Sequence, residues 1–285
     1  MVPFLYHITK RLLYFFTIKN GFCSQFGRLV LHACIFSACV GGSSEYKLVG
    51  KERRNASHTI TLSHQAFSKL EKKWVSSAYF DRGLKYKNSR FEVVSFPSLL
   101  DIYGPADDSD AVLLNCIDDY QGIISFDDVR RYNLQLAIKI KLAQGSHRPS
   151  WLQPLLIVVP DNSNPPFLER FLTANISDLQ FVRLADYYAP VDREILPEVS
   201  AVVGRDVFKD NCLFCHSING VGGIKGGSLL EKFDFRLGVE KLRFRNTFLV
   251  VHGKDNDSKQ NTKQFLTDNH LEALSKFLSK MTKSN

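Results

Sequence analysis

The sequence lacks several features that would each define a class of protein. No apolar run is long enough to cross a bilayer as a helix, because the stretch from Leu29 to Val40 covers only about a dozen residues. No Lys/Arg block of the kind that follows a phosphate backbone is present, which argues against nucleic acid as a partner. No internal repeat or low-complexity tract is visible, and the content of hydrophobic and charged residues is ordinary for a folded protein.

Six cysteines are too unevenly placed for a disulfide framework. Three lie in the first 45 residues, two form a Cys-x-x-Cys pair, and Cys116 stands alone. The pattern therefore indicates a local motif at the pair, and Cys116 needs an explanation of its own.

Residues 1–45 have the form of a targeting segment. Basic residues without acidic ones precede the apolar run 29–40, and small residues follow at 41–44. Phe36-Ser37-Ala38-Cys39 resembles the lipobox of bacterial lipoproteins, which implies a lipid on Cys39. We expect export to the periplasm, with association to the membrane through Cys39 or through a retained N-terminal segment.

Residues 46–190 show a mixture of strand and helix signals. Alternation predicts a half-buried strand over 134–142, and continuous apolar runs predict buried strands over 111–117 and 155–159. The sequence predicts short helices over 97–103 and 167–175. The polar, proline-containing stretch 188–197 indicates a connector.

The chain from residue 199 onward is expected to be all-α. A helix is predicted over 200–215, followed by a glycine-rich loop over 220–227. Thr267 is a good N-cap for a terminal helix whose apolar stripe includes Leu271, Leu274 and Phe277.

Cys212, Cys215 and His216 form Cys-x-x-Cys-His, the attachment signature of a c-type haem. Two cysteines on one helical turn reach the two vinyl groups of the porphyrin, and the next histidine points at the iron. Three other readings stay open, of which the rarest is a structural disulfide between Cys212 and Cys215, because such a bridge is strained. A zinc site would need a second ligand pair, yet downstream only His252 and His270 occur, without the usual short spacing. A thioredoxin-like pair would follow a strand, whereas this one follows a predicted helix.

The strings "VGRDVFKDNCLFCHSINGVGGIKGGSLL" and "FLTDNHLEALSKFLSKM" make the region from about 202 to 281 resemble the class I cytochrome c domain. The resemblance implies one covalent haem c, with His216 as proximal iron ligand. It also implies that Gly204 and Phe208 on the first helix pack against Phe277 on the last. Gly227 stands where the family has a proline whose carbonyl orients the proximal histidine, so we expect another main-chain carbonyl to orient His216.

The sixth ligand of the iron departs from that family. The family offers a methionine before the final helix, but the segment from His252 to Leu266 has none, and Met281 is the only methionine after the motif. His252 is the candidate distal ligand. An ordinary surface-loop histidine, Lys254, water or Met281 remain alternatives. Two histidine ligands would lower the reduction potential relative to a His/Met pair.

The strings "FEVVSFPSLLDIYGP", "AVLLNCIDDYQGIISFDDV" and "LQPLLIVVPDNSNPP" resemble the sulfite-oxidase-type molybdopterin-binding fold. The resemblance implies that Cys116 is a thiolate ligand of molybdenum. Here, however, Cys116 is followed by Ile-Asp-Asp instead of the family's Gly-Asn, and no Arg-Arg pair precedes the apolar run. The sequence therefore favours a degenerate domain without molybdopterin, in which Cys116 is a small buried residue.

These observations predict an α+β protein with four parts: a leader (1–45), a mixed α/β sulfite-oxidase-like domain (46–190), a linker (191–198) and a small all-α cytochrome c domain (199–285). The expected function is periplasmic electron transfer by one haem, rather than catalysis. One alternative is a molybdopterin-dependent oxidoreductase that passes electrons from Cys116 to the haem. Another is a sensor or assembly module that uses the middle domain as a binding surface. Because the net charge is +8 and part of the surplus lies after residue 197, we expect redox partner proteins with acidic docking faces.

Overall fold

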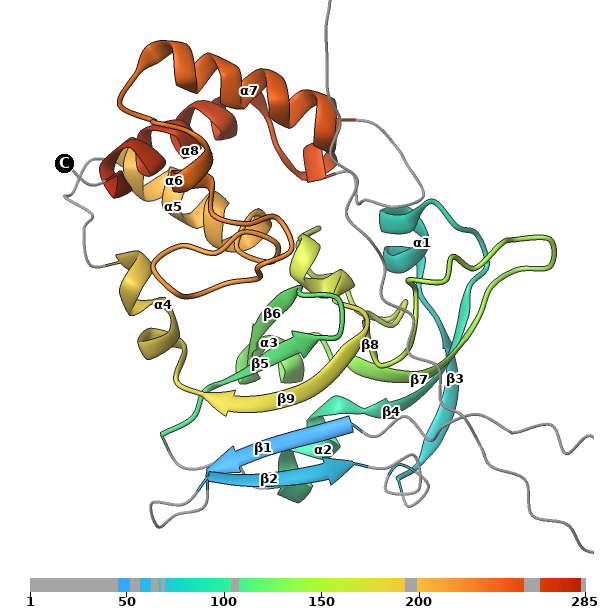
Figure 1. The fold of residues 1–285 in the computed structure, drawn as a ribbon. Coiled ribbons are helices and arrows are strands. Elements are labelled where there is room, and N and C mark those ends of the chain that lie inside the picture. Colours follow the sequence, from blue (N-terminus) through green and yellow to red (C-terminus); the bar gives the residue numbers. More distant parts are fainter. Residues whose placement is uncertain are drawn as a thin grey trace, which may run out of the picture. The chain divides into compact units, whose positions relative to one another are not determined.

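The computed structural model describes residues 46–51, 57–62, 67, 70–103, 108–192, 199–253 and 262–282. These residues form both helices and strands, which confirms the α+β class (Figure 1). The described residues all belong to one compact unit. The predicted leader with Cys39, Lys254 and most of the predicted linker lie outside the described residues. Among the described helices, none has both the length and the apolar character needed to cross a membrane.

Two sheets carry the strands of the first half. One has the order β2-β1-β9-β5-β6, in which β1 and β9 are parallel and the other pairs are antiparallel. Its strands are β1 (Tyr46–Lys51), β2 (Ser57–Leu62), β5 (Ala111–Cys116), β6 (Gln121–Ser125) and β9 (Ile176–Val182). The other sheet is antiparallel, with the order β3-β4-β7-β8. Its strands are β3 (Lys72–Ser76), β4 (Arg90–Ser95), β7 (Gln135–Lys141) and β8 (Leu156–Val158).

Strand β5 is buried on both faces, as its continuous apolar run predicts. Val112 and Leu114 pack into one hydrophobic core, whereas Ala111 and Leu113 pack into a second core that also holds the C-terminal helices. The three predicted strands are confirmed within a residue or two at each end. Strand β5 thus joins the sheet to the helical part of the chain.

The helices of the first half are α1 (Ala78–Leu84), α2 (Phe96–Tyr103), α3 (Phe126–Arg131) and α4 (Leu184–Asp192). Two expectations were wrong. The segment 167–175 holds only a 3₁₀ turn, η2 (Glu169–Leu172). The first part of the expected connector is helical, because burial of Tyr188 and Val191 against the second core outweighs the proline at 190.

The second half contains α5 (Val199–Asn211), α6 (Leu229–Lys232), α7 (Gly238–His252), the 3₁₀ turn η3 (Thr262–Phe265) and α8 (Asp268–Met281). Helix α5 ends four residues before its predicted end, and α7 has no counterpart in the prediction. The predicted cap of α8 is confirmed. Thr267 Oγ1 accepts a hydrogen bond from the His270 N–H over 3.2 Å, and the Thr267 N–H donates to His270 Nδ1 over 3.3 Å.

Helices α5 and α8 cross at Gly204, where the two backbones nearly touch. A Cβ at Gly204 would overlap the carbonyl of Ala273 and lie 2.8 Å from Phe277 Cβ. One turn further along, the rings of Phe208 and Phe277 stand 5.6 Å apart, centroid to centroid, and both are fully buried. The crossing fixes the orientation of α5, and therefore the position of the Cys212–His216 segment that follows it.

We therefore predict that Gly204→Ala destabilises the protein by about 1–3 kcal/mol, since overpacking outweighs the gain in helix propensity. Gly238→Ala is the matched control, because an added Cβ there meets nothing within 4 Å. Urea unfolding of both variants measures the difference. Equal midpoints for the two variants would contradict the close crossing.

Candidate functional site

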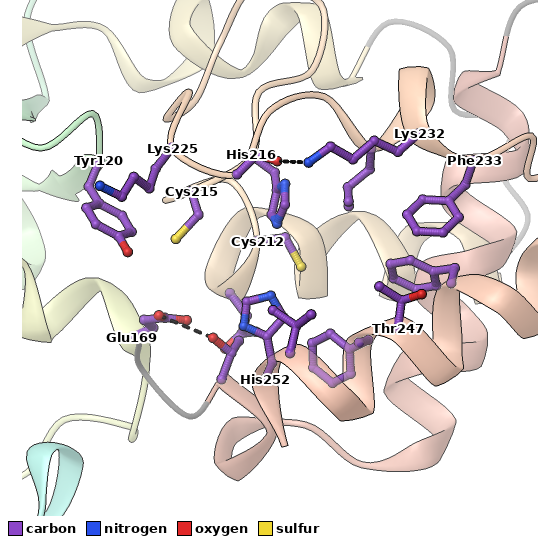
Figure 2. A pocket seen from close by; sticks show the side chains of 17 residues that line it. Tyr120, Glu169, Cys212, Cys215, His216, Lys225, Lys232, Phe233, Thr247 and His252 are labelled. Atoms are coloured by element: carbon purple, nitrogen blue, oxygen red, sulfur yellow. Dashed lines mark hydrogen bonds between the residues drawn. The ribbon is translucent and has the colours of Figure 1, made fainter. Parts of the chain in front are cut away.

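A cavity of about 370 Å³ lies beside the end of α5 and holds the residues of the Cys-x-x-Cys-His motif (Figure 2). This volume lies in the range of small-molecule and cofactor sites. Most of the exposed wall is apolar. The remaining lining side chains include Tyr120, Glu169, Lys225, Leu229, Lys232, Phe233, Phe244, Thr247, Phe248, Val251, His252 and Thr262.

The motif continues α5 as one further hydrogen-bonded turn. The Cys215 N–H and the His216 N–H both donate to the Cys212 carbonyl, over 3.0 and 2.8 Å. This turn brings the two sulfur atoms and the His216 imidazole into the same cavity (Figure 2). Both cysteines are free thiols. Burial raises the pKa of each thiol, so both are neutral at physiological pH.

His216 is oriented by the glycine loop. Its Nδ1 lies 2.8 Å from the Gly227 carbonyl oxygen, which can only accept, so Nδ1 carries the proton. The expectation that another carbonyl would replace the missing proline was therefore wrong, because Gly227 presents its own carbonyl. Burial lowers the pKa of His216. The neutral ring then leaves the Nε2 lone pair available to a metal.

His252 faces His216 across the cavity. The two ring centroids are 6.3 Å apart and the ring planes are inclined by 78°. A metal bound to one nitrogen of each ring at about 2 Å would separate the centroids by about 6 Å. His252 is the last residue of α7 and not part of a loop, and its ring lies 5.2 Å from that of Phe248.

The residues present fit a haem group. Two thiols and a neutral histidine lie on one turn, a second histidine stands at metal-sharing distance, and aromatic rings from α7 and from the segment before it line the remaining wall. Within the described ranges, no group of three or more His, Cys, Asp and Glu side chains is placed to hold a bare metal ion.

Two sequence candidates lie away from this cavity. Met281 is buried in α8 and does not line the cavity. Cys116 ends β5, outside the cavity lining, with its sulfur 3.9 Å from the Leu114 carbonyl oxygen. Burial, and then the charges of Asp118 and Asp178, raise the pKa of the Cys116 thiol.

Sequence reasoning missed most side chains of the cavity wall, including Tyr120, Glu169 and Thr262, which come from outside the C-terminal helices. Tyr120 stacks on Phe214 of the motif at 4.9 Å, centroid to centroid. No local pattern reveals these residues, because they lie far from the motif in the chain. Helix α7 had a signal, since Phe244, Phe248 and His252 recur every four residues and so share one helical face.

Comparison with models of known protein families found no match, and comparison with curated proteins found none either.

Gly227 has a φ of +67°, which a proline ring cannot adopt. We predict that Gly227→Pro displaces the carbonyl that holds His216, although it introduces the residue of the resembling family. The free energy of unfolding should fall by on the order of 1–3 kcal/mol, which lowers the thermal midpoint by several degrees. Gly238→Pro is the matched control, because it stands at the first position of a helix, where proline is tolerated. Scanning calorimetry compares the two. A Gly227→Pro variant as stable as the control would refute this account of the loop.

Proposed function

We propose that the protein is a c-type cytochrome that transfers single electrons through one haem, attached to Cys212 and Cys215 and ligated by His216 and His252. The observation that carries the proposal is the pair of facing imidazoles, 6.3 Å apart, beside two free thiols of a Cys-x-x-Cys-His motif. When bound, the haem supplies an iron that alternates between Fe(III) and Fe(II).

The chain's own residues would bind, orient and insulate that group. Cys212 and Cys215 form thioethers, and the Gly227 carbonyl holds His216 with Nε2 toward the cavity. Buried rings such as Phe233, Phe244 and Phe248 exclude water and lower the local polarity. Lys225 and Lys232, both exposed, add positive charge to the cavity lining, which suits a redox partner with an acidic docking face.

The wider organisation is part of the same proposal. The segment 199–285 would be the cytochrome c portion, and 46–190 a sulfite-oxidase-like portion that has lost its cofactor. Export to the periplasm, with a lipid on Cys39, would place the chain where c-type haem is attached. A molybdenum-dependent oxidoreductase is disfavoured because Cys116 is followed by Ile117-Asp118-Asp119 in place of the Gly-Asn of the resembling family.

Covalent attachment is tested at the two cysteines. The double variant Cys212→Ser, Cys215→Ser should release its haem in acid acetone, because serine forms no thioether. The wild-type chain and the control Cys116→Ser should each give a c-type pyridine haemochrome and one iron without molybdenum by metal analysis. Haem that stays attached in the double variant would overturn the proposal. Molybdenum in the wild type would favour the oxidoreductase.

Ligation by His252 is tested by absorption spectroscopy. His252→Ala should convert a low-spin ferric spectrum into a high-spin one that is restored by added imidazole, because the sixth position loses its nitrogen ligand. Met281→Leu is the control and should stay low-spin, since Met281 does not line the cavity. A low-spin His252→Ala variant would exclude His252, and loss of the low-spin form in Met281→Leu would assign the ligand to α8.

A further inference from the structure

Glu169 is a buried carboxyl group in the wall of the cavity. It lies in η2, is 1% exposed, and lines the cavity together with Cys212, Cys215 and His216 (Figure 2). Thr262 Oγ1 donates a hydrogen bond to Glu169 Oε1 over 3.4 Å. Glu169 Oε2 has no hydrogen-bond partner among the described residues. One weak hydroxyl donor is poor solvation for a buried negative charge.

No basic side chain compensates that charge within the part of the chain that the structure describes. The neighbouring Arg170 is directed elsewhere, with its guanidinium 2.9 Å from Asp210 Oδ1 and 3.2 Å from Asp128 Oδ2. None of the ion pairs of the described residues includes Glu169. Within this part of the chain, only a proton or a positive charge inside the cavity could neutralise the carboxyl group.

The other titratable groups around the cavity do not supply this positive charge. Cys212 and Cys215 are neutral, both as thiols and as thioethers, and burial raises the pKa of Tyr120, so its phenol also stays neutral. Within the proposed function His216 and His252 would be neutral iron ligands, and the exposed Lys225 and Lys232 form no ion pair with Glu169. Burial raises the pKa of Glu169 to about 8, and the Thr262 hydrogen bond only partly opposes this.

We propose that Glu169 is a proton-binding site coupled to reduction of the haem. This inference rests on the proposed function. One electron from the partner redox protein converts Fe(III) to Fe(II), and one proton from solvent adds to the Glu169 carboxylate, so the net charge of the cavity stays constant. On oxidation the extra positive charge of Fe(III) attracts the carboxylate, and the proton returns to solvent.

The consequence is a reduction potential that depends on pH. Between the pKa of Glu169 in the Fe(III) form and its higher pKa in the Fe(II) form, the potential should fall by up to about 59 mV per pH unit, the value for one proton per electron. Potentiometric titration of the full haem-loaded chain over roughly pH 5 to 9 measures this slope. Glu169→Gln keeps the shape of the side chain but cannot ionise, so it should remove the slope.

Two further variants make the test specific. Glu231→Gln, at an exposed carboxylate in α6, is the matched control and should keep the slope. Thr262→Val removes the hydroxyl that favours the carboxylate and should move the sloping region to higher pH. A slope that survives in Glu169→Gln would overturn the assignment.

An infrared measurement decides the case if Glu169→Gln is not recovered with haem. The wild-type difference spectrum between reduced and oxidised protein should show a protonated carboxyl band that appears on reduction and shifts in heavy water. A spectrum without this band would refute the role of Glu169. Absence of covalent haem from the wild-type chain would refute the proposed function itself, so the two failures are distinguishable.

Discussion

The glycine loop must lie directly on the Cys212–His216 turn, with no side chain between the two backbones. The Gly223 N–H donates to the Leu213 carbonyl over 2.9 Å, and the Gly226 N–H donates to the Cys215 carbonyl over 2.7 Å. A Cβ on Gly226 would overlap the His216 imidazole. This close contact places the Gly227 carbonyl beside His216 Nδ1. The tautomer and the orientation of the His216 ring therefore depend on the packing of the loop.

The turn between two strands of the sheet also supports this loop and the motif. In the turn between β5 and β6, the Asp119 carbonyl accepts from the N–H groups of Ile224 and Lys225, over 3.0 and 3.2 Å. The Gln121 N–H donates to the Phe214 carbonyl over 3.0 Å. Because β5 also buries Ala111 and Leu113 in the core of the C-terminal helices, the cavity wall and its support form one packed structure. Loss of either contact would loosen the site without touching its ligands.

Few of the side chains that line the cavity place a charge inside it. Arg170 is occupied by Asp128 and Asp210, and burial keeps both thiols neutral. The two lysines of the lining are exposed to solvent. Within the proposed electron-transfer function, a cavity of low polarity holds few polar groups and little water that must reorient each time the charge of the iron changes. Glu169 is the exception. Because it is buried without a neighbouring cation, a change in the charge of the iron would shift the pKa of its carboxyl group.

The local patterns of the sequence predicted much of the scaffold. The buried strands at 111–117 and 155–159, the Thr267 cap and the Cys-x-x-Cys-His turn follow from short-range periodicity and hydrogen bonding, which neighbouring residues determine by themselves. The composition of the cavity did not follow in this way. Glu169 comes from a 3₁₀ turn more than forty residues before the motif, and His252 ends a helix that the sequence reading missed. Helix α5 contacts η2, η3 contacts α7, and Thr262 of η3 donates a hydrogen bond to Glu169. These contacts join segments that are far apart in the sequence, so local periodicity does not predict them.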